Sequence, residues 1–257
     1  MKNGFLLLLG LILARQGTAQ PLHFAGLFPA YSQTGILHKK LLYNFYLSST
    51  IDAFSQTVEN VHYPATNLQV YLQPGLIYRL KPHLQVGAAY AFVKHNLFGL
   101  RVNENRLFVQ GIYTHRLPSG TLAHRLRYEE RYPFNLKTQR GSKASLFRYQ
   151  LGYNLPLYDP KTRKHGFYAS ASHEFFLCLT GATNSPISSK NAFNGENWSY
   201  VGAGYTFRKA GRLELGYMLQ NLVRNARKEH RYLHLLQVSY NTTFNLEDFM
   251  VWLYTPY

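Results

Sequence analysis

The residues best suited to chemistry lie close together in one stretch of the chain. Within 121–132, one parity contains Leu122, Leu126, Tyr128 and Tyr132, and the other contains Arg125, Arg127, Glu129 and Arg131. A two-residue period is typical of a β-strand, so these four side chains share one face. Arginine and glutamate side chains form strong, charge-assisted hydrogen bonds where water is scarce. The pattern therefore predicts an ion-paired network on one face of this strand.

The preceding segment carries similar residues, and a tight turn at 117–120 joins the two as a hairpin. This hairpin places Arg106 opposite Arg131. It also places Glu129 diagonal to both Arg106 and Gln110, within reach of long side chains. The predicted network therefore extends over two neighbouring strands.

Two later segments add Arg148 and Glu174, which face each other if the strands flanking 157–165 are regular. The five arginines exceed the three glutamates by two positive charges, a surplus that favours a small anion as ligand. Salt-bridged struts that merely fill an interior would use the same residues. The predicted network comprises Glu104, Arg106, Gln110, Arg125, Arg127, Glu129, Arg131, Arg148 and Glu174.

The same two-residue period recurs along the chain from Lys40 onward, and it predicts about ten strands, within a range of 8–12. Each strand has roughly the 9–11 residues that a tilted strand needs to cross a bilayer. We predict an all-β, antiparallel, up-and-down transmembrane barrel with its apolar face toward lipid. The predicted strands are 40–51, 68–80, 83–93, 104–116, 121–132, 146–156, 166–178, 198–208, 212–221 and 230–241.

The connections between these strands alternate in length. Long connections are expected at 52–67, 94–103, 133–145, 179–197 and 222–229. The others are short, except for an intermediate one at 157–165. Outer-membrane barrels have long extracellular loops and short periplasmic turns, so both termini should lie in the periplasm. The extracellular half of the lumen would then contain Glu104, Arg106, Glu129, Arg131, Arg148 and Glu174.

The beginning of the chain predicts export. Lys2, an apolar run and the small residues before Gln20 have the order of a signal peptide cleaved after residue 19. Residues 20–257 would then form one barrel domain in the cell outer membrane. The tail at 248–257 fits either a further strand or a periplasmic plug, and Tyr257 fits a terminal aromatic that the barrel-assembly machinery reads.

The composition supports this location. The chain has 21 Tyr and 17 Phe, which suits aromatic belts at the two membrane interfaces. The single cysteine, Cys178, cannot form an internal disulfide. The net charge is +16, and in an exported protein the expected partners are outer-membrane lipids and lipopolysaccharide, with no nucleic acid.

Several motifs together resemble a family of largely Bacteroidota outer-membrane proteins known as domain of unknown function 2490. The resemblance covers nearly the whole chain after residue 19, and it implies an outer-membrane barrel without implying an activity. Trp198 departs from the family pattern, in which an arginine is usual, so a lumen contact there is in question. The motifs are Arg125-Leu-Arg-Tyr-Glu-Glu-Arg131, Glu104-Asn-Arg106 with Gln110, Phe147-Arg-Tyr-Gln150, Glu174 before Phe175-Phe176, Asn197 through Gly202-Ala-Gly-Tyr205, and Leu215-Gly-Tyr217.

No residue set predicts catalysis, a metal site or a cofactor. Ser172, His173 and Glu174 include the three types of a hydrolytic triad, but adjacent residues of a strand face opposite sides. His230 and His234 share a face without an acidic or cysteine partner nearby. We expect a non-enzymatic barrel, either a structural or surface-binding protein or a narrow anion-preferring pore. The alternative is a hydrolase acting on lipid A or phospholipid at the extracellular rim.

Overall fold

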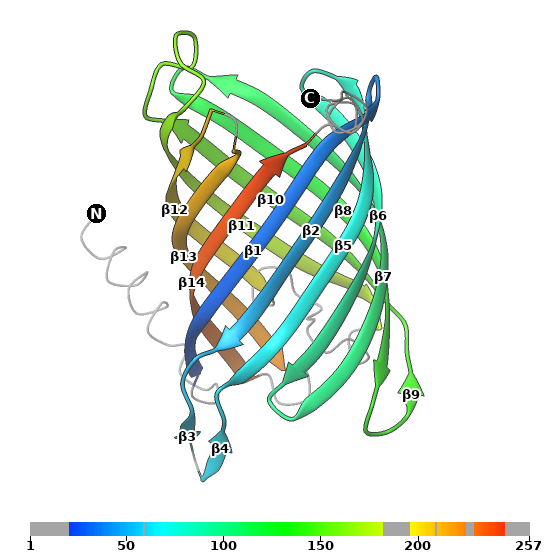
Figure 1. Cartoon of the computed structure of the whole chain (residues 1–257). Helices are drawn as coiled ribbons and strands as arrows, with labels where there is room; N and C mark the ends of the chain where they lie inside the picture. The colour runs from blue at the N-terminus through cyan, green and yellow to red at the C-terminus, as the bar shows by residue number, and fades with distance from the viewer. Residues whose placement is uncertain (1–20, 59, 182–195, 209, 225–228, 245–257) are drawn as a thin grey trace, which may run out of the picture.

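The computed structural model describes residues 21–58, 60–181, 196–208, 210–224 and 229–244 (Figure 1). Among these residues, no helix is long and apolar enough to cross a membrane. The predicted signal peptide at 1–19 and the tail at 248–257 lie outside the described residues.

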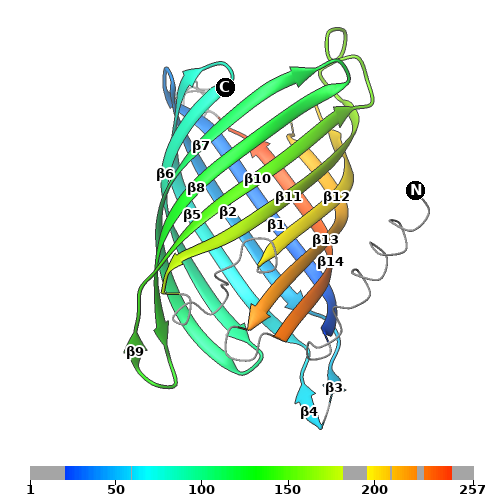
Figure 2. The ribbon, with the colours of Figure 1, turned by 180° about the vertical axis from the view of Figure 1, so that it is seen from behind.

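The predicted barrel is confirmed, and its wall has 11 strands (Figures 1 and 2). The wall strands are β1 (Leu22–His38), β2 (Leu41–Asp52), β5 (Thr66–Lys81), β6 (Leu84–Leu97), β7 (Leu100–Leu117), β8 (Gly120–Asn135), β10 (Ala144–Pro156), β11 (Gly166–Thr180), β12 (Asn197–Thr206), β13 (Arg212–Arg224) and β14 (Glu229–Thr243). The short strands β3 (Gln56–Val58), β4 (Val61–Tyr63) and β9 (Arg140–Gly141) lie in connections.

The strand beyond the predicted ten is β1, which closes the barrel. Its sequence lacks a clear alternation because Phe24 and Phe28 are buried in the interior while Leu27 is 43% exposed on the outside. Pro29 is also unusual within a strand, since it cannot donate a ladder hydrogen bond. β1 pairs in parallel with β14, from Leu22 opposite Arg231 onward, and all other neighbouring wall strands are antiparallel.

An odd number of strands places the two ends of the barrel's chain at opposite rims. We call the rim with the β3–β4 hairpin and β9 the loop end, and the rim with the β1–β2, β5–β6 and β7–β8 turns the turn end (Figure 1). β1 begins at the loop end and β14 finishes at the turn end. The prediction that both ends of the barrel lie on one side is therefore wrong for the described strands.

The predicted facing of the side chains agrees with their burial. In β8, Leu126 is 48% exposed and Tyr128 is 39% exposed on the outer face, whereas Arg127 and Glu129 are buried inside. Leu68 is an exception because a bulge between Thr50 and Ile51 leaves it out of the ladder. It lies in an interior cluster instead of facing outward.

The connection predicted at 94–103 is much shorter than expected. β6 and β7 continue toward each other and leave only Phe98 and Gly99 between them. Both residues have positive φ, 50° and 86°, as a two-residue type I′ hairpin requires. The loop end therefore combines this tight turn with longer connections.

Candidate functional site

Glu129 lies at the centre of the predicted network. Its Oε1 accepts hydrogen bonds from Arg148 Nη1 at 2.6 Å and from Arg127 Nη1 at 3.3 Å. Its Oε2 accepts one from Arg131 Nε at 2.9 Å, and Arg106 Nη1 lies 4.0 Å away. Glu129 is 0% exposed, so these four guanidinium groups replace the water that the carboxylate has lost.

The other acidic and amide members join this centre. Glu174 Oε1 accepts hydrogen bonds from Arg148 Nε at 3.0 Å and from Arg125 Nη2 at 2.8 Å. Gln110 Oε1 accepts one from Arg127 Nη2 at 2.9 Å. Glu104 accepts a hydrogen bond from Arg106 and lies near Arg131, so the structure brings all nine predicted residues into one group.

His95 extends the network and was not among the predicted residues. Its Nε2 lies 2.6 Å from Glu104 Oε2, which also accepts a hydrogen bond from Arg106 Nη2 at 3.0 Å. Its Nδ1 lies 3.3 Å from Gln69 Nε2, and both residues are buried. His95 was missed because it falls in the predicted connection at 94–103 rather than in a strand.

The observed strand register agrees with the residue pairs predicted for β7 and β8 and differs from the pair predicted for β10 and β11. Arg106 stands opposite Arg131, and Phe108 stands opposite Glu129, as the hairpin geometry predicts. Arg148 was predicted opposite Glu174, but it pairs with Phe176 while Glu174 pairs with Gln150. The residues joining β10 and β11 shift the register by two, and the long side chains still meet across the diagonal.

Aromatic rings support the guanidinium groups. Arg127 lies 3.9 Å from the centre of the Phe108 ring, and Arg148 lies 4.3 Å from that of Phe176. Such contacts stabilise a cation within an apolar surrounding. They also hold the planes of both guanidinium groups in place.

An apolar cluster fills the lumen near the loop end. The Phe24 and Phe98 rings pack with their centres 4.5 Å apart and their planes tilted by 41°. Arg231, 6% exposed, lies 4.1 Å from the centre of the Phe98 ring. The two-residue period alone did not predict this apolar cluster, because the inward-facing residues of these strands are apolar, as their outward-facing residues are. Its buried members are Phe24, Phe28, Leu68, Leu97, Tyr200, Met218, Leu222, Leu233 and Leu235.

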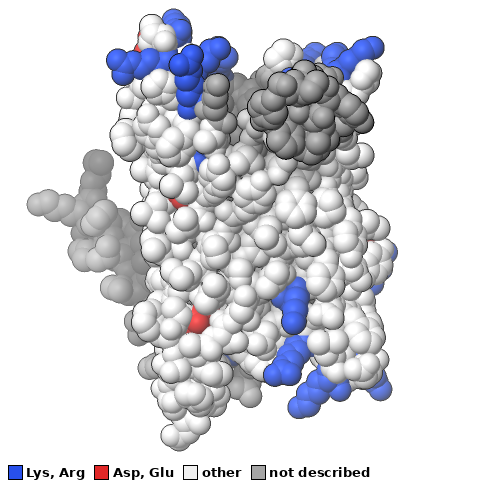
Figure 3. Space-filling model, in the orientation of Figure 1, with Lys and Arg blue, Asp and Glu red and all other residues white. Residues whose placement is uncertain are grey.

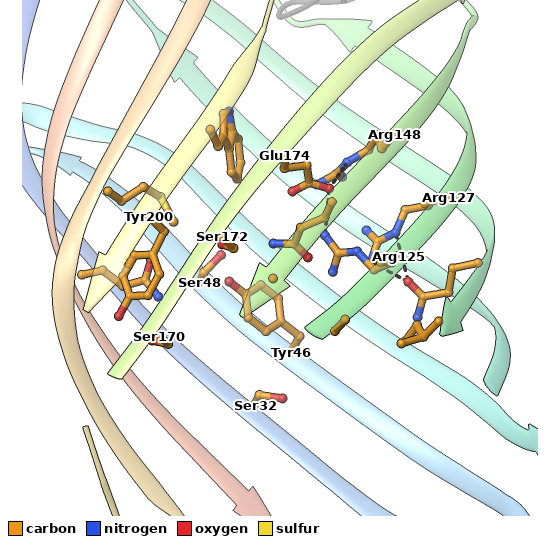
Figure 4. A pocket seen from close by; sticks show the side chains of 18 of the residues that line it. Ser32, Tyr46, Ser48, Arg125, Arg127, Arg148, Ser170, Ser172, Glu174 and Tyr200 are labelled. Atoms are coloured by element: carbon orange, nitrogen blue, oxygen red, sulfur yellow. Dashed lines mark hydrogen bonds and ion pairs between the residues drawn. The ribbon is translucent and has the colours of Figure 1, made fainter. Parts of the chain in front are cut away.

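Among the described residues, the lumen is open toward the turn end. A cavity of about 580 Å³ extends from the network to Thr121 and Asn154 near that rim. Inward residues of β8 change from buried at Arg127 to partly exposed at Arg125 and Thr121. In Figure 4, Arg125 and Arg127 lie on one side of the cavity, and residues of other strands face them.

Glu196 and Glu214 also line this cavity, and they reduce the predicted surplus of positive charge. Glu214 accepts hydrogen bonds from Tyr200 and Ser170, both at 2.8 Å. Its inward face could have been inferred from alternation with the apolar residues of its strand. Glu196 precedes β12 and is 1% exposed, and its Oε2 has no hydrogen-bond partner among the described residues. Burial raises the pKa of Glu196 to about 7, against the lowering effect of Arg131.

The outer surface of the described strands contains a histidine–serine pair relevant to hydrolysis. His173 faces away from Glu174, as its strand position predicts, and its Nδ1 lies 2.8 Å from Ser199 Oγ on β12. The neighbouring Trp198 faces inward and packs on Phe176. Within the described parts of the chain, no group of three His, Cys, Asp or Glu residues is arranged to hold a metal.

Comparison with known proteins identifies a family. The family model described as "Protein of unknown function (DUF2490)" matches residues 43–231. Neither a curated protein nor a solved structure matches the chain. The matched residues include all nine members of the predicted network.

Proposed function

Because this chain belongs to the DUF2490 family, whose description assigns no activity, we propose a function from its geometry. We propose an outer-membrane barrel whose lumen is closed toward the loop end and carries a binding pocket open toward the turn end. Binding, rather than general diffusion, would be its role.

The outer surface supports a membrane location. Large apolar side chains are exposed on many wall strands, among them Leu76, Leu107, Leu126 and Leu215. Figure 3 shows Lys and Arg at the upper rim and in the lower part of one face, with a mainly uncharged band between them. A soluble protein would rarely expose so large an apolar surface. A bilayer would cover it.

The observation that carries the proposed closure is the burial of four arginines of the network and of their glutamate partners. Side chains of Arg106, Arg127, Arg131 and Arg148 are all 6% exposed or less, and those of their glutamate partners are 5% or less. The apolar cluster lies in the lumen nearer the loop end. A hydrated ion would have to break these buried ion pairs to pass.

Planar bilayer recording of the purified protein tests this closure. We expect no stable current steps above those of a matched detergent blank. Reproducible anion-selective steps would contradict the closure and support a narrow pore. The control for loss of the barrel is gel mobility: the folded protein in an unheated sample should migrate differently from the heated, unfolded protein.

A second candidate is a lipid-directed hydrolase, which the 2.8 Å contact between His173 and Ser199 favours. A histidine beside a serine is the first requirement for an activated hydroxyl nucleophile. The measurement is fatty-acid release from lipid A or phospholipid vesicles by wild type and Ser199→Ala. Turnover that Ser199→Ala abolishes would establish this candidate, whereas absence of turnover by the wild type would reject it.

A further inference from the structure

Among the described residues that line the pocket, Arg125 is the cation most accessible to a ligand. The Arg125 side chain is 25% exposed, whereas those of the other four network arginines are at most 6% exposed. Its Nη2 contacts Glu174, but its Nε has no hydrogen-bond partner among the described residues. A partly exposed guanidinium group favours a carboxylate or phosphate as ligand.

The facing walls carry neutral hydrogen-bonding groups. Hydroxyl and amide side chains from several strands line the cavity, and Asn44 Oδ1 accepts a hydrogen bond from Gln73 Nε2 at 3.1 Å. Such groups donate and accept, as the hydroxyl groups of a sugar also do. Figure 4 shows Ser32, Ser48 and Ser172 around the cavity, with Tyr46 and Tyr200 among them.

Other cavity-lining groups have unused hydrogen-bonding capacity. Glu196 Oε2, Trp198 Nε1 and Gln237 Oε1 have no partner within the described chain, although all three atoms are buried. Buried polar atoms without partners are unfavourable, so a polar ligand that satisfied them would gain affinity. The cavity volume of about 580 Å³ is within the usual size of small-molecule sites, about 300–1,000 Å³.

We propose that this pocket binds a small hydroxyl-rich anion of the sugar acid or sugar phosphate class. The anionic group would contact Arg125, and hydroxyl groups would contact the serine and amide side chains and Glu196. Trp198 and Tyr200 would cover the apolar face of the sugar ring. The inference rests on the proposed closed lumen in one respect, which is that the ligand enters from the turn end.

The fluorescence of Trp198 provides a measurement of ligand binding. The chain has two tryptophans, so Trp252→Phe leaves Trp198 as the only one, and its fluorescence can be followed in detergent. The probes are glucose 6-phosphate, glucuronate, glucose and inorganic phosphate. We expect saturable changes with the first two, and binding at least about tenfold weaker for glucose and phosphate.

Two variants and a control locate the site. Arg125→Gln should weaken binding of glucose 6-phosphate by about tenfold or more, since a charged hydrogen bond is lost. Ser172→Leu, which fills the cavity without touching the ion pairs, should block binding. Arg140→Gln removes the same charge from exposed β9 and should leave binding unchanged.

Each other outcome overturns the inference. Equal binding of glucose, or no effect of Arg125→Gln in a folded variant, would contradict the anion contact. Equal binding of inorganic phosphate would contradict the sugar contacts. No saturable change with any probe would reject the ligand class while leaving the proposed closure to the bilayer recording.

Discussion

Glu129 and Glu130 are consecutive carboxylates that face opposite sides of the barrel wall. Glu129 is fully buried beside four arginines, whereas Glu130 contacts Lys143, whose side chain is 59% exposed. Glu129→Gln should lower the free energy of unfolding by about 3–5 kcal/mol, because it leaves buried arginines underpaired. Glu130→Gln should lower it by at most about 1 kcal/mol. Urea unfolding in detergent measures both, and equal effects would contradict the importance of the buried network.

The predicted and the missed residues of the site differ in a physical way. Arg127 and Glu129 were predicted because charges on the buried face of an alternating strand need partners. His95 and Glu196 were missed because they fall in predicted connections, where alternation carries no information. Arg231 was missed because its inward neighbours, Leu233 and Leu235, are apolar like outward residues.

At the scale of the strand, substitutions of Gly99 and Gly111 distinguish the effect of backbone conformation from the effect of side-chain packing. Neither Gly99 nor Gly111 has any atom within 4 Å of an added Cβ, but only Gly99, with φ +86°, has a positive φ. Gly99→Ala should lower the free energy of unfolding by about 1–2 kcal/mol through the turn's conformation. Gly111→Ala should be neutral or stabilise by up to about 1 kcal/mol. Urea unfolding measures the free energy of unfolding of both variants. Equal values for the two would contradict the tight β6–β7 turn.

The facing of β8 makes a second prediction at this scale. Leu126→Arg places a charge on the proposed lipid face and should destabilise the barrel by about 2–4 kcal/mol. Leu136→Arg makes the same change in the connection after β8 and should have little effect. Unfolding in phospholipid vesicles measures both. Equal tolerance of the two arginines would place the outer face of β8 away from lipid.

Strand facing was predictable for most of the wall, and the strand count was predictable to within one strand. Ten segments have a clear two-residue period because one face contacts an apolar medium and the other a polar lumen. β1 lacks it because the lumen beside its first half is filled with apolar side chains, so both faces are apolar. Predicting β1 therefore requires knowledge of the apolar cluster in the lumen, which is built from residues far apart in the sequence.

The odd strand count makes the orientation of the whole molecule a separate question, since the barrel's two chain ends lie at opposite rims. We predict that the loop end faces outward, because long connections favour the extracellular side. In a Cys178→Ser background, a membrane-impermeant maleimide should label Thr138→Cys at the loop end in intact cells. It should label Ser119→Cys at the turn end only after permeabilisation. The reverse pattern would place the mouth of the pocket at the cell surface, where its ligand would come from the medium rather than the periplasm.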